Sequence, residues 1–420
     1  MNQQKLFDRA RHVMPAAGFG NYDPEVIIRE GRGARVWDED NNEYIDYLIG
    51  SGPMILGHCH PEVVEALSEQ LSRGTTFFAQ NAHGIELAEE ICRVVPCAEQ
   101  MRYVSTGTEA DMYAMRLARA FTNRDKILKF EGGYHGMSSE AQMSLAPEKL
   151  VNFPVPVADS AGIPESVRGE MLVAPYNDID FVRALLAEQG SQVAGMIVEP
   201  FQRIIPPAPG FLEALREECD KYGVILIFDE VVTGFRFAYG GVQSLYGVTP
   251  DLCTLGKLIG GGLPLAAVAG KADIMSHFDK AKVAADRFVM QIGTLSGNPL
   301  AAVAGLKTLE ILRRPGQYER LYEIGNTLME GIRDRLGAAG HEVQVVGHPT
   351  LFDVVFTSES VENYRDWLHG TRNQAVEFHA QLKGRNILKG LGKFYISLAL
   401  TEDDISQTLE SVTEAANNLG

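Results

Sequence analysis

Lys257 and Asp229 carry the functional groups whose chemistry is most informative in this chain of 420 residues. Lys257 lies in a glycine-rich segment, residues 254–264, and Asp229 follows an apolar run at residues 224–228 that is typical of a buried strand. A lysine amine held on rigid backbone can form a Schiff base with an aldehyde, and a carboxylate at a strand end can pair with a protonated ring nitrogen. The two residues therefore predict a site for pyridoxal 5′-phosphate (PLP).

The strand end that carries Asp229 also places Val231 on the same side, because alternate residues of a strand share one face of a sheet. Asp229 would keep the ring nitrogen protonated, since opposite charges favour each other's charged forms, and Val231 would cover the ring. The alternative for Asp229 is structural, with its carboxylate capping the turn after the strand. Lys257 must be neutral to attack an aldehyde, and burial and nearby positive charge favour that form.

Residues 105–110 (STGTEA) follow an apolar strand and begin a helix rich in Ala, Met, Leu and Arg. A helix N-terminus binds phosphate through its unpaired N–H groups and its dipole, and a glycine lets the anion approach the backbone. Gly107 and Thr108 are the phosphate ligands that this pattern predicts. The same segment also fits an ordinary capping box, in which a Ser or Thr before the helix and a nearby Glu satisfy the first N–H groups of the helix.

Residues 131–136 (EGGYHG) end the next strand, and their glycines would let an aromatic ring lie flat against a planar cofactor. Tyr134 is the predicted stacking residue, and the alternative is a loop aromatic that packs on the core. Three interpretations of His135 stay open: it orients Tyr134, contacts the edge of the cofactor ring, or fills the turn.

The elements that must position these residues alternate between helices and short apolar strands from about residue 55 onwards. Strands are predicted at 101–105, 126–130, 193–198, 224–229, 252–255 and 265–269, with helices such as 108–121 and 211–221 between them. Such alternation predicts an α/β fold with a parallel sheet covered on both faces. Sites in such sheets lie at the carboxyl ends of the strands.

Both ends of the chain depart from this pattern. A helix at 3–13 precedes two strands at 34–38 and 43–47 that are joined by a turn. Near the other end, a long helix at 317–338, a few strands and a closing helix at 402–417 are predicted. We expect a small, partly antiparallel region from the first segment and a second compact unit from the last.

The composition favours small molecules as partners. A net charge of −17 disfavours nucleic acid and anionic membranes, because phosphate binding needs clustered Lys and Arg. Five scattered cysteines lack the density of a secreted scaffold, so they predict reduced thiols. The first residues lack the apolar core of a signal peptide, and no apolar run approaches the roughly 20 residues of a membrane helix. We therefore expect a cytoplasmic protein.

Residues 58–60 (His-Cys-His) offer imidazole and thiolate groups, which are good zinc ligands. Adjacent residues on extended backbone point to opposite faces, however, and the sequence shows no fourth ligand. We expect no metal site.

Six motifs occur in order along nearly the whole chain: STGTEA at 105–110, GGYHG at 132–136, VEP at 198–200, DEVVTGFR at 229–236, TLGK at 254–257 and GTLSGNP at 293–299. Together they resemble the class III aminotransferases, and within that family most closely the glutamate-1-semialdehyde 2,1-aminomutases. The resemblance implies fold type I, with a mostly parallel seven-stranded sheet in a large domain, a small α+β domain built from both chain ends, and active sites at a homodimer interface. It assigns residues 55–315 to the large PLP-binding domain, and 1–54 and 316–420 to the small one.

The resemblance also implies a role for each matching residue. Those that would hold the cofactor are Lys257 through a Schiff base, Asp229 at the ring nitrogen, Tyr134 and Val231 on the two ring faces, and Gly107 and Thr108 at the phosphate. Thr294 would reach the phosphate from the neighbouring subunit. Glu199 and Gln202 would line the site near the cofactor's ring oxygen, and His135 is counted among the cofactor-binding residues.

The sequence departs from the family where the substrate is bound. Many relatives carry a longer loop with a Glu after the VEP motif, whereas residues 201–207 form a shorter loop here. No arginine occurs after Arg385, although many class III transaminases grip the substrate carboxylate with one in the C-terminal region. The candidate replacements are Arg203, ranked first, with Arg29 and Lys393, and each of them also fits a role on the surface or in packing.

Two features of the aminomutases are missing as well. Their gating carboxylate is absent from residues 390–396, and Ser51 stands near the position of an aromatic. A mutase must retain its diamine intermediate until both halves react, so the loss of gating favours release. We therefore expect an aminotransferase that moves an amino group from an amino acid or amine to a keto acid or aldehyde. The alternatives are an aminomutase or racemase that uses the same cofactor, and a catalytically silent PLP-fold or nucleotide-binding protein.

Overall fold

The computed structural model describes residues 2–419, which divide into two compact units. Unit 1 comprises Met1–Val64, Pro315–Ser360 and Leu368–Gly420, and unit 2 comprises Glu65–Arg314 and Val361–Trp367. The domain limits at residues 54 and 315 that the resemblance implies remain a prediction.

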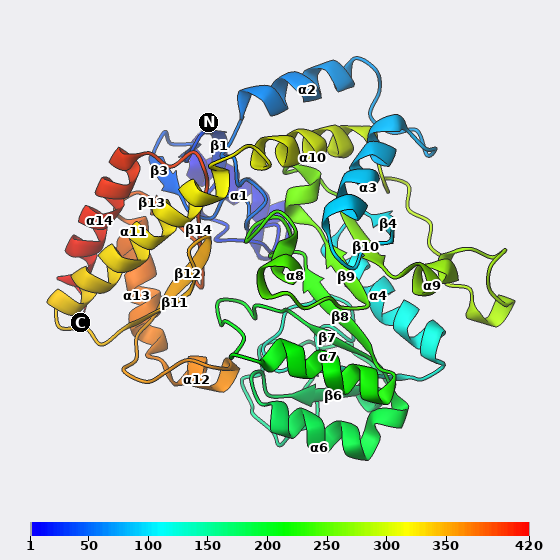
Figure 1. The fold of residues 1–420 in the computed structure, drawn as a ribbon. Coiled ribbons are helices and arrows are strands. Elements are labelled where there is room, and N and C mark those ends of the chain that lie inside the picture. The colour runs from blue at the N-terminus through cyan, green and yellow to red at the C-terminus, as the bar shows by residue number, and fades with distance from the viewer. Residues whose placement is uncertain (1, 420) are drawn as a thin grey trace. The chain divides into compact units, whose positions relative to one another are not determined.

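Unit 2 is built on a seven-stranded sheet with the strand order β4-β10-β9-β8-β7-β5-β6 (Figure 1). Its strands are β4 (Gln100–Val104), β5 (Lys126–Phe130), β6 (Met171–Ala174), β7 (Val193–Val198), β8 (Ile225–Glu230), β9 (Leu252–Leu255) and β10 (Ala266–Gly270). β10 runs antiparallel to both of its neighbours, and the other paired strands are parallel. The predicted α/β fold with a mostly parallel sheet is confirmed, and so are all six predicted strands. β6 was not predicted, because a run of four residues is too short to show a period.

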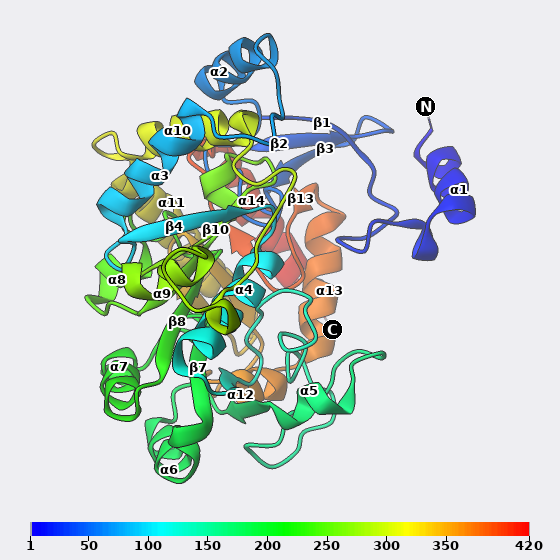
Figure 2. The same cartoon turned by 90° about the vertical axis from the view of Figure 1, so that its right-hand side faces the viewer.

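Helices cover both faces of this sheet. α4 (Gly107–Thr122) packs against β7 to β10, and α7 (Phe211–Tyr222) packs against β8 and α6 (Ile179–Gln189). Figure 2 shows α4 and α7 on opposite sides of the sheet. α4 forms where it does because Ala110, Ala114, Leu117 and Ala118 make one apolar face, and a capping box starts the helix.

The remaining elements of unit 2 surround the sheet, and α3 packs against α10. They are α3 (Ala82–Val94), α5 (Glu165–Gly169), α8 (Gly241–Tyr246), α9 (Ala272–Met275), α10 (Pro299–Leu312), and short 3₁₀ helices at Gly190–Gln192, Lys257–Gly260, Ser276–Phe278 and Ala285–Arg287. α2 (Pro61–Leu71) begins in unit 1 and ends in unit 2, and α12 (Tyr364–His369) does the reverse.

Unit 1 combines segments from both ends of the chain in one sheet, as the resemblance implies. The antiparallel strands β1 (Ile28–Arg32), β2 (Arg35–Asp38) and β3 (Glu43–Asp46) are joined by β13 (Ile387–Leu388), which pairs parallel to β3. The other elements are α1 (Gln3–Val13), a 3₁₀ helix at Pro15–Ala17, α11 (Gln317–Ala338), β11 (Gln344–His348), β12 (Leu351–Val355), α13 (Arg372–Lys383), β14 (Phe394–Tyr395) and α14 (Glu402–Ala416). The predicted helices and the predicted turn between β2 and β3 are confirmed.

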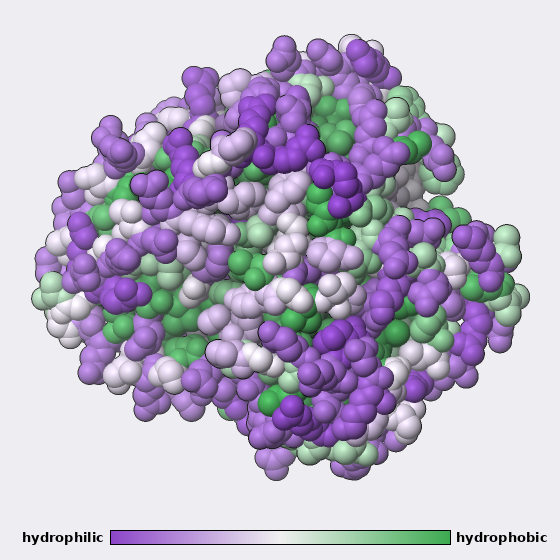
Figure 3. Space-filling view, in the orientation of Figure 1, coloured by the Kyte–Doolittle hydropathy of each residue, from purple (hydrophilic) through white to green (hydrophobic). Residues whose placement is uncertain are grey.

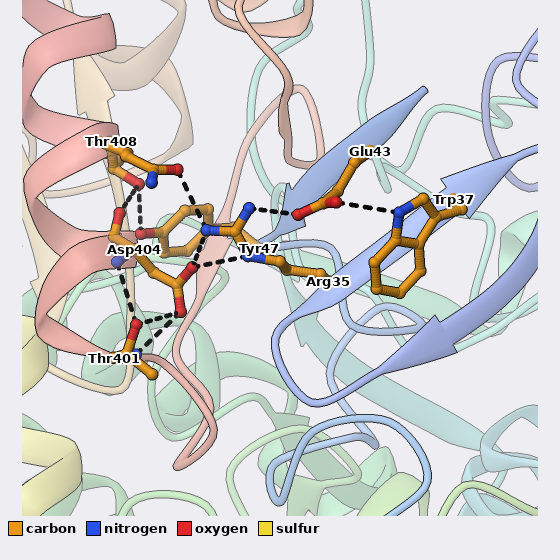
Figure 4. A network of polar contacts seen from close by, with 8 residues as sticks. Arg35, Trp37, Glu43, Tyr47, Thr401, Asp404 and Thr408 are labelled. Carbon is orange, nitrogen blue, oxygen red and sulfur yellow. Dashed lines mark hydrogen bonds and ion pairs between the residues drawn. The ribbon is translucent and has the colours of Figure 1, made fainter. Parts of the chain in front are cut away.

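A network around Arg35 ties β2 to the closing helix α14 (Figure 4). The Arg35 guanidinium donates to Asp404 Oδ1 at 2.6 and 3.0 Å, and it also donates to Glu43. Asp404 is buried and is the third residue of α14, where its other oxygen accepts the N–H and hydroxyl of the N-cap Thr401. One carboxylate therefore both caps the helix and compensates a partly buried arginine.

We expect Asp404→Ala to lower the free energy of unfolding by about 2 kcal/mol, because it removes a helix cap and leaves Arg35 without its buried partner. Trp37 donates to Glu43 in the same network, so tryptophan fluorescence in a denaturant titration would follow the change. The matched control is Asp403→Ala, one position earlier on α14 and exposed, which should cost less than about 0.5 kcal/mol. Equal losses in the two variants would contradict the role assigned to the network.

Hydrophilic residues predominate on the face drawn in Figure 3, with smaller hydrophobic areas between them. Within residues 2–419, no helix has the length and apolar character that crossing a membrane requires.

Candidate active site

The site lies in unit 2, where several strands end at the same edge of the sheet. Asp229 on β8 is paired with Thr254 on β9, and Lys257 begins the turn directly after β9. The carboxyl ends of parallel neighbours meet at one edge, so Asp229 and Lys257 leave the sheet together. The loops after β5 and β7 and the start of α4 after β4 reach the same edge, because these strands run in the same direction.

Asp229 is the centre of a buried polar cluster. Its Oδ2 lies 2.8 Å from His135 Nδ1, and its Oδ1 accepts the backbone N–H of Val231 at 3.1 Å. An ionised carboxylate is only an acceptor, so Nδ1 of His135 carries the proton of this bond. The opposite ring nitrogen, Nε2, is buried and has no hydrogen-bond partner among the residues that the structure describes. None of the three interpretations left open for His135 included its contact with Asp229, which is the contact that the structure shows.

The start of α4 has features of both interpretations of the STGTEA motif, the capping box and the phosphate site. Thr106 is the N-cap, and Glu109 accepts the backbone N–H groups of Ser105 and Thr106, which makes a complete capping box. The N–H groups of the first two helical residues, Gly107 and Thr108, have no partner within residues 2–419. Two unpaired donors at the positive end of a 16-residue helix suit a phosphate.

Two glycines allow the site loops to pack this closely. A Cβ on Gly107 would lie 2.9 Å from Val231 Cγ1, so the start of α4 could not approach the end of β8 with a larger residue. Gly136 has φ +85°, and a Cβ there would lie 2.4 Å from Thr108 Oγ1. The loop after β5 therefore contacts the phosphate end of the site, and Thr108 Oγ1 also accepts the N–H of Met137 at 3.2 Å.

Tyr134 stands in the loop between β5 and the phosphate end and is 37% exposed, which leaves part of its ring open to a ligand. Its backbone N–H donates to Glu199 Oε2 at 2.8 Å, so the buried Glu199 carboxylate positions the loop that carries the ring. The Arg203 guanidinium lies 5.2 Å from the ring centroid, which is a cation–π contact. Burial raises the pKa of the Tyr134 hydroxyl, which therefore stays protonated at neutral pH.

Gln202 lies beside the same loop. Its side-chain amide donates to the carbonyl of Glu131 at 2.8 Å, and its Oε1 is buried without a partner in the described part of the chain. Backbone hydrogen bonds between Gln202 and Ile205 close the short loop, and Arg203 within it has φ +62°. The shorter loop predicted at residues 201–207 is thus a tight turn.

Lys257 is half-buried and has φ +47°, in the left-handed region. Residues with a Cβ avoid this region at a cost of roughly 1–2 kcal/mol, and such strain concentrates at functional sites. Its neighbour Gly256 contacts the end of β8, because a Cβ there would lie 3.1 Å from Val231 Cγ1. The lysine is therefore held beside the strand end that carries Asp229.

Three of the predicted residues are not tied to this cluster by a recorded contact. Thr294 lies in an exposed turn of unit 2. Arg29 and Lys393 belong to unit 1, where Arg29 donates to Glu30 at 2.7 Å and to Asn41, and the Lys393 amine lies 5.8 Å from the ring centroid of Tyr395. All three roles remain predictions.

Sequence reasoning missed two buried polar residues of the site, Asp111 and Lys129. Asp111 interrupts the apolar face of α4, and a carboxylate at a core position of a helix is the signal that could have found it. The Lys129 amine is fully buried and donates to the carbonyls of Gly133, Ala141 and Met143, which holds the loop on both sides of Tyr134. Burial lowers the pKa of Lys129 to about 7.

The possible metal ligands have other partners. His58 Nε2 lies 2.8 Å from Asp46 Oδ2, and Cys59 is exposed. The side chains of Asp111, His135 and Asp229 bring potential ligand atoms within 4.8 Å of one another. However, the 2.8 Å separation of His135 Nδ1 and Asp229 Oδ2 is that of a direct hydrogen bond, which occupies the two atoms that would bind an ion.

A mostly parallel seven-stranded sheet with a strained lysine, a buried aspartate and an open helix N-terminus at one edge defines a fold type I PLP-dependent enzyme. A family model described as aminotransferase class-III matches residues 19–415, and the chain belongs to that family. It is 41% identical over 433 aligned residues to glutamate-1-semialdehyde 2,1-aminomutase 2 of Brevibacillus brevis, with 99% of each protein covered.

Solved structures agree with the family. An omega-transaminase from Sphaerobacter thermophilus is 34% identical with a TM-score of 0.93, and the alignment covers 99% of this chain and 97% of that one. A transaminase with PLP bound is 31% identical with a TM-score of 0.90, covering 100% and 98%. The protein is therefore a PLP-dependent enzyme whose relatives include transaminases and an aminomutase.

The residues present fit this cofactor. The free N–H groups at Gly107 and Thr108 suit its phosphate, and the Asp229 carboxylate suits its protonated ring nitrogen. The buried, unpartnered atoms His135 Nε2 and Gln202 Oε1 mark a place where a polar ligand is needed to complete the hydrogen bonding.

Proposed function

We propose that the enzyme is an aminotransferase, which moves an amino group from an amino acid or amine to a keto acid or aldehyde. The observation that carries this is the arrangement of Lys257 and Asp229 at the ends of the paired strands β9 and β8. When bound, PLP supplies an electron-withdrawing ring that stabilises negative charge on the substrate carbon. All other parts of the mechanism are supplied by the side chains and backbone groups of this protein.

Each site residue has a role in this proposal. Lys257 Nζ holds the cofactor and, once the substrate amine has displaced it, takes a proton from the amine-bearing carbon. Asp229 keeps the ring nitrogen protonated, and His135 orients Asp229 through their 2.8 Å hydrogen bond. The residues that contact the rest of the cofactor are Tyr134 and Val231 at the ring faces, Gly107 and Thr108 at the phosphate, and Glu199 and Gln202 near the ring oxygen.

Transamination is favoured over the aminomutase reaction by two features of the chain. Ser51 stands where the aminomutases have an aromatic, and residues 390–393 form a tight turn without a carboxylate where their gating residue is expected. A mutase must retain its diamine intermediate until both half-reactions are complete. Without these gating groups we expect the intermediate to be released after the first half-reaction. The racemase alternative would likewise convert one substrate without a second one.

A screen of amine donors tests the proposal, scored by conversion of the bound cofactor to its aminated form and by turnover with and without added keto acid. We expect turnover only when a keto acid or aldehyde is present, because the second half-reaction needs an acceptor. Conversion of a single substrate in the absence of any acceptor would instead show an isomerase.

Arg203 is the cation that we propose for the substrate carboxylate, because its guanidinium carbon lies 5.2 Å from the centroid of the Tyr134 ring, beside the predicted cofactor site. We expect Arg203→Gln to raise KM for amino-acid donors roughly 10-fold or more, the cost of losing one charge-assisted hydrogen bond pair. Amine donors without a carboxylate are the matched control, and their KM should change little. An equal change for both donor classes would assign Arg203 to loop structure.

A homodimer is also part of the proposal, with Thr294 serving the neighbouring subunit. Asn81 Nδ2 donates to the carbonyl of Gly297 at 2.8 Å, which joins the start of α3 to the loop that carries Thr294. Together with β4, these two segments line an open hollow of about 690 Å³. Exposed large apolar side chains lie in or next to these segments, namely Phe77, Phe78, Ile85, Met290, Ile292 and Leu295. Such a patch is typical of a surface that a second subunit covers.

We further propose a cytoplasmic location. All five cysteines are free thiols in the structure, which suits a reducing compartment.

A further inference from the structure

Asp111 is a buried carboxyl group that the proposed mechanism does not use. It lies in the second turn of α4 and is 2% exposed, among the apolar side chains that pack this helix on the sheet. A carboxylate that is ionised and unpaired in such surroundings is costly, so the folded protein must compensate it or keep it protonated.

The compensation available to Asp111 is shared with Asp229. Thr254 Oγ1 lies 2.6 Å from Asp111 Oδ1 and 3.4 Å from Asp229 Oδ1, and a hydroxyl has one proton to donate. The three side chains of Asp111, Asp229 and His135 bring their polar atoms within 4.8 Å of one another. If both carboxyls were ionised, two negative charges would share one hydroxyl proton in a desolvated space.

The groups around Asp111 come from four elements. Asp229 is on β8, Thr254 is on β9, His135 follows β5, and Glu199 follows β7. Burial is the largest cause that raises the pKa of Asp111, and the charge of Asp229 and that of Glu199 raise it further. His135 already donates to Asp229, so its proton does not compensate Asp111.

We propose that Asp111 is a positioning residue, which stays a neutral carboxylic acid and, with the Thr254 hydroxyl, holds the Asp229 carboxylate in place for the ring nitrogen of the cofactor. This proposal rests on the proposed function of Asp229. A neutral Asp111 leaves a single negative charge opposite the ring nitrogen and offers an O–H donor that fixes the orientation of Asp229. An amide can do the same, whereas an aliphatic side chain cannot.

The first test uses the apoenzyme, so it does not depend on catalysis. An acid whose pKa is higher in the folded state binds more protons there than in the unfolded state, where it is near 3.9. Its contribution to stability is complete below about pH 4 and is lost as pH rises towards the folded pKa. We therefore expect Asp111→Asn, which cannot ionise, to raise the melting temperature by about 5 °C at pH 8 and to change it much less at pH 5. If the difference in melting temperature between Asp111→Asn and the wild type were the same at both pH values, Asp111 would not be a neutral acid in the folded protein.

The second test uses the holoenzyme and the pH at which the visible absorbance of the bound cofactor changes. We expect Asp111→Asn to titrate as the wild type does, and Asp111→Leu to shift this pH by about one unit because Asp229 loses its partner. Glu230→Gln is the matched control, since Glu230 is a buried carboxyl on the same strand as Asp229 that accepts from residues 242 and 243 instead. It should leave the titration unchanged.

The outcomes separate this inference from the function on which it rests. If the wild-type protein gains no visible absorbance with PLP, the proposed function is wrong. If the absorbance is normal but changes at the same pH in Asp111→Leu and in the wild type, only the role of Asp111 is wrong. If Asp111→Leu fails to fold, the melting curves of the Asn variant still decide whether Asp111 is neutral.

Discussion

Lys257→Ala is expected to abolish the visible absorbance that PLP gives the wild-type enzyme and to lower turnover by at least roughly 10³-fold, because one amine acts as both nucleophile and proton carrier. The phosphate ligands at Gly107 and Thr108 are unaffected, so the variant should still bind PLP without a covalent bond. Absorbance spectra and equilibrium binding of PLP separate these two effects. Borohydride reduction of the wild type, followed by mass spectrometry, should place the adduct on Lys257.

The matched control is Lys149→Ala, an exposed lysine of unit 2, which should keep both the absorbance and the turnover. A small primary amine added to Lys257→Ala should restore part of the turnover, since it supplies the missing base. If the variant keeps the visible band, or if the adduct forms on another lysine, Lys257 is not the residue that holds the cofactor.

The sheet could be predicted from the sequence because its strands are buried on both faces. The segments 126–130, 193–198 and 252–255 are short apolar runs, and the structure places β5, β7 and β9 at these residues. Once parallel strands are expected, the residues that follow them must meet at one edge. For this reason Asp229, Tyr134 and Lys257 could be grouped although they are far apart in the sequence.

The contacts within the site could not be predicted in the same way. The sequence left three interpretations of His135 open, since the partner of an imidazole depends on side chains from another strand, here Asp229. Asp111 was overlooked because its neighbours in α4 suggest only an amphipathic helix, and the hydroxyl that contacts it lies 143 positions away in the sequence. For Arg29, the charge suggested a substrate-binding role, but the sequence did not reveal that its guanidinium donates to Glu30 and Asn41 in unit 1.

Asp229→Asn should lower kcat by roughly 10²–10⁴-fold while leaving most of the affinity for PLP, because it removes the negative charge opposite the ring nitrogen and keeps the shape of the side chain. The amide oxygen can still accept the N–H of Val231, so the end of β8 keeps its conformation. A neutral partner no longer favours a protonated ring nitrogen, and the ring then withdraws less charge from the substrate carbon. Single-turnover rates with one amine donor, measured beside the dissociation constant for PLP, separate chemistry from binding.

Asp251→Asn is the matched control for this loss of charge. Asp251 and Asp229 are equally buried, each 5% exposed, but Asp251 precedes β9 and accepts from Arg216, Lys271 and the N–H of Leu226 at the start of β8. It therefore lies at the amino ends of the two strands, opposite the edge that carries Lys257. Its substitution should reduce stability and leave kcat nearly unchanged below the melting temperature. If Asp229→Asn instead turned over like the wild type, the charge at the strand end would have no electronic role, and the carboxylate would be only the cap of the turn after β8.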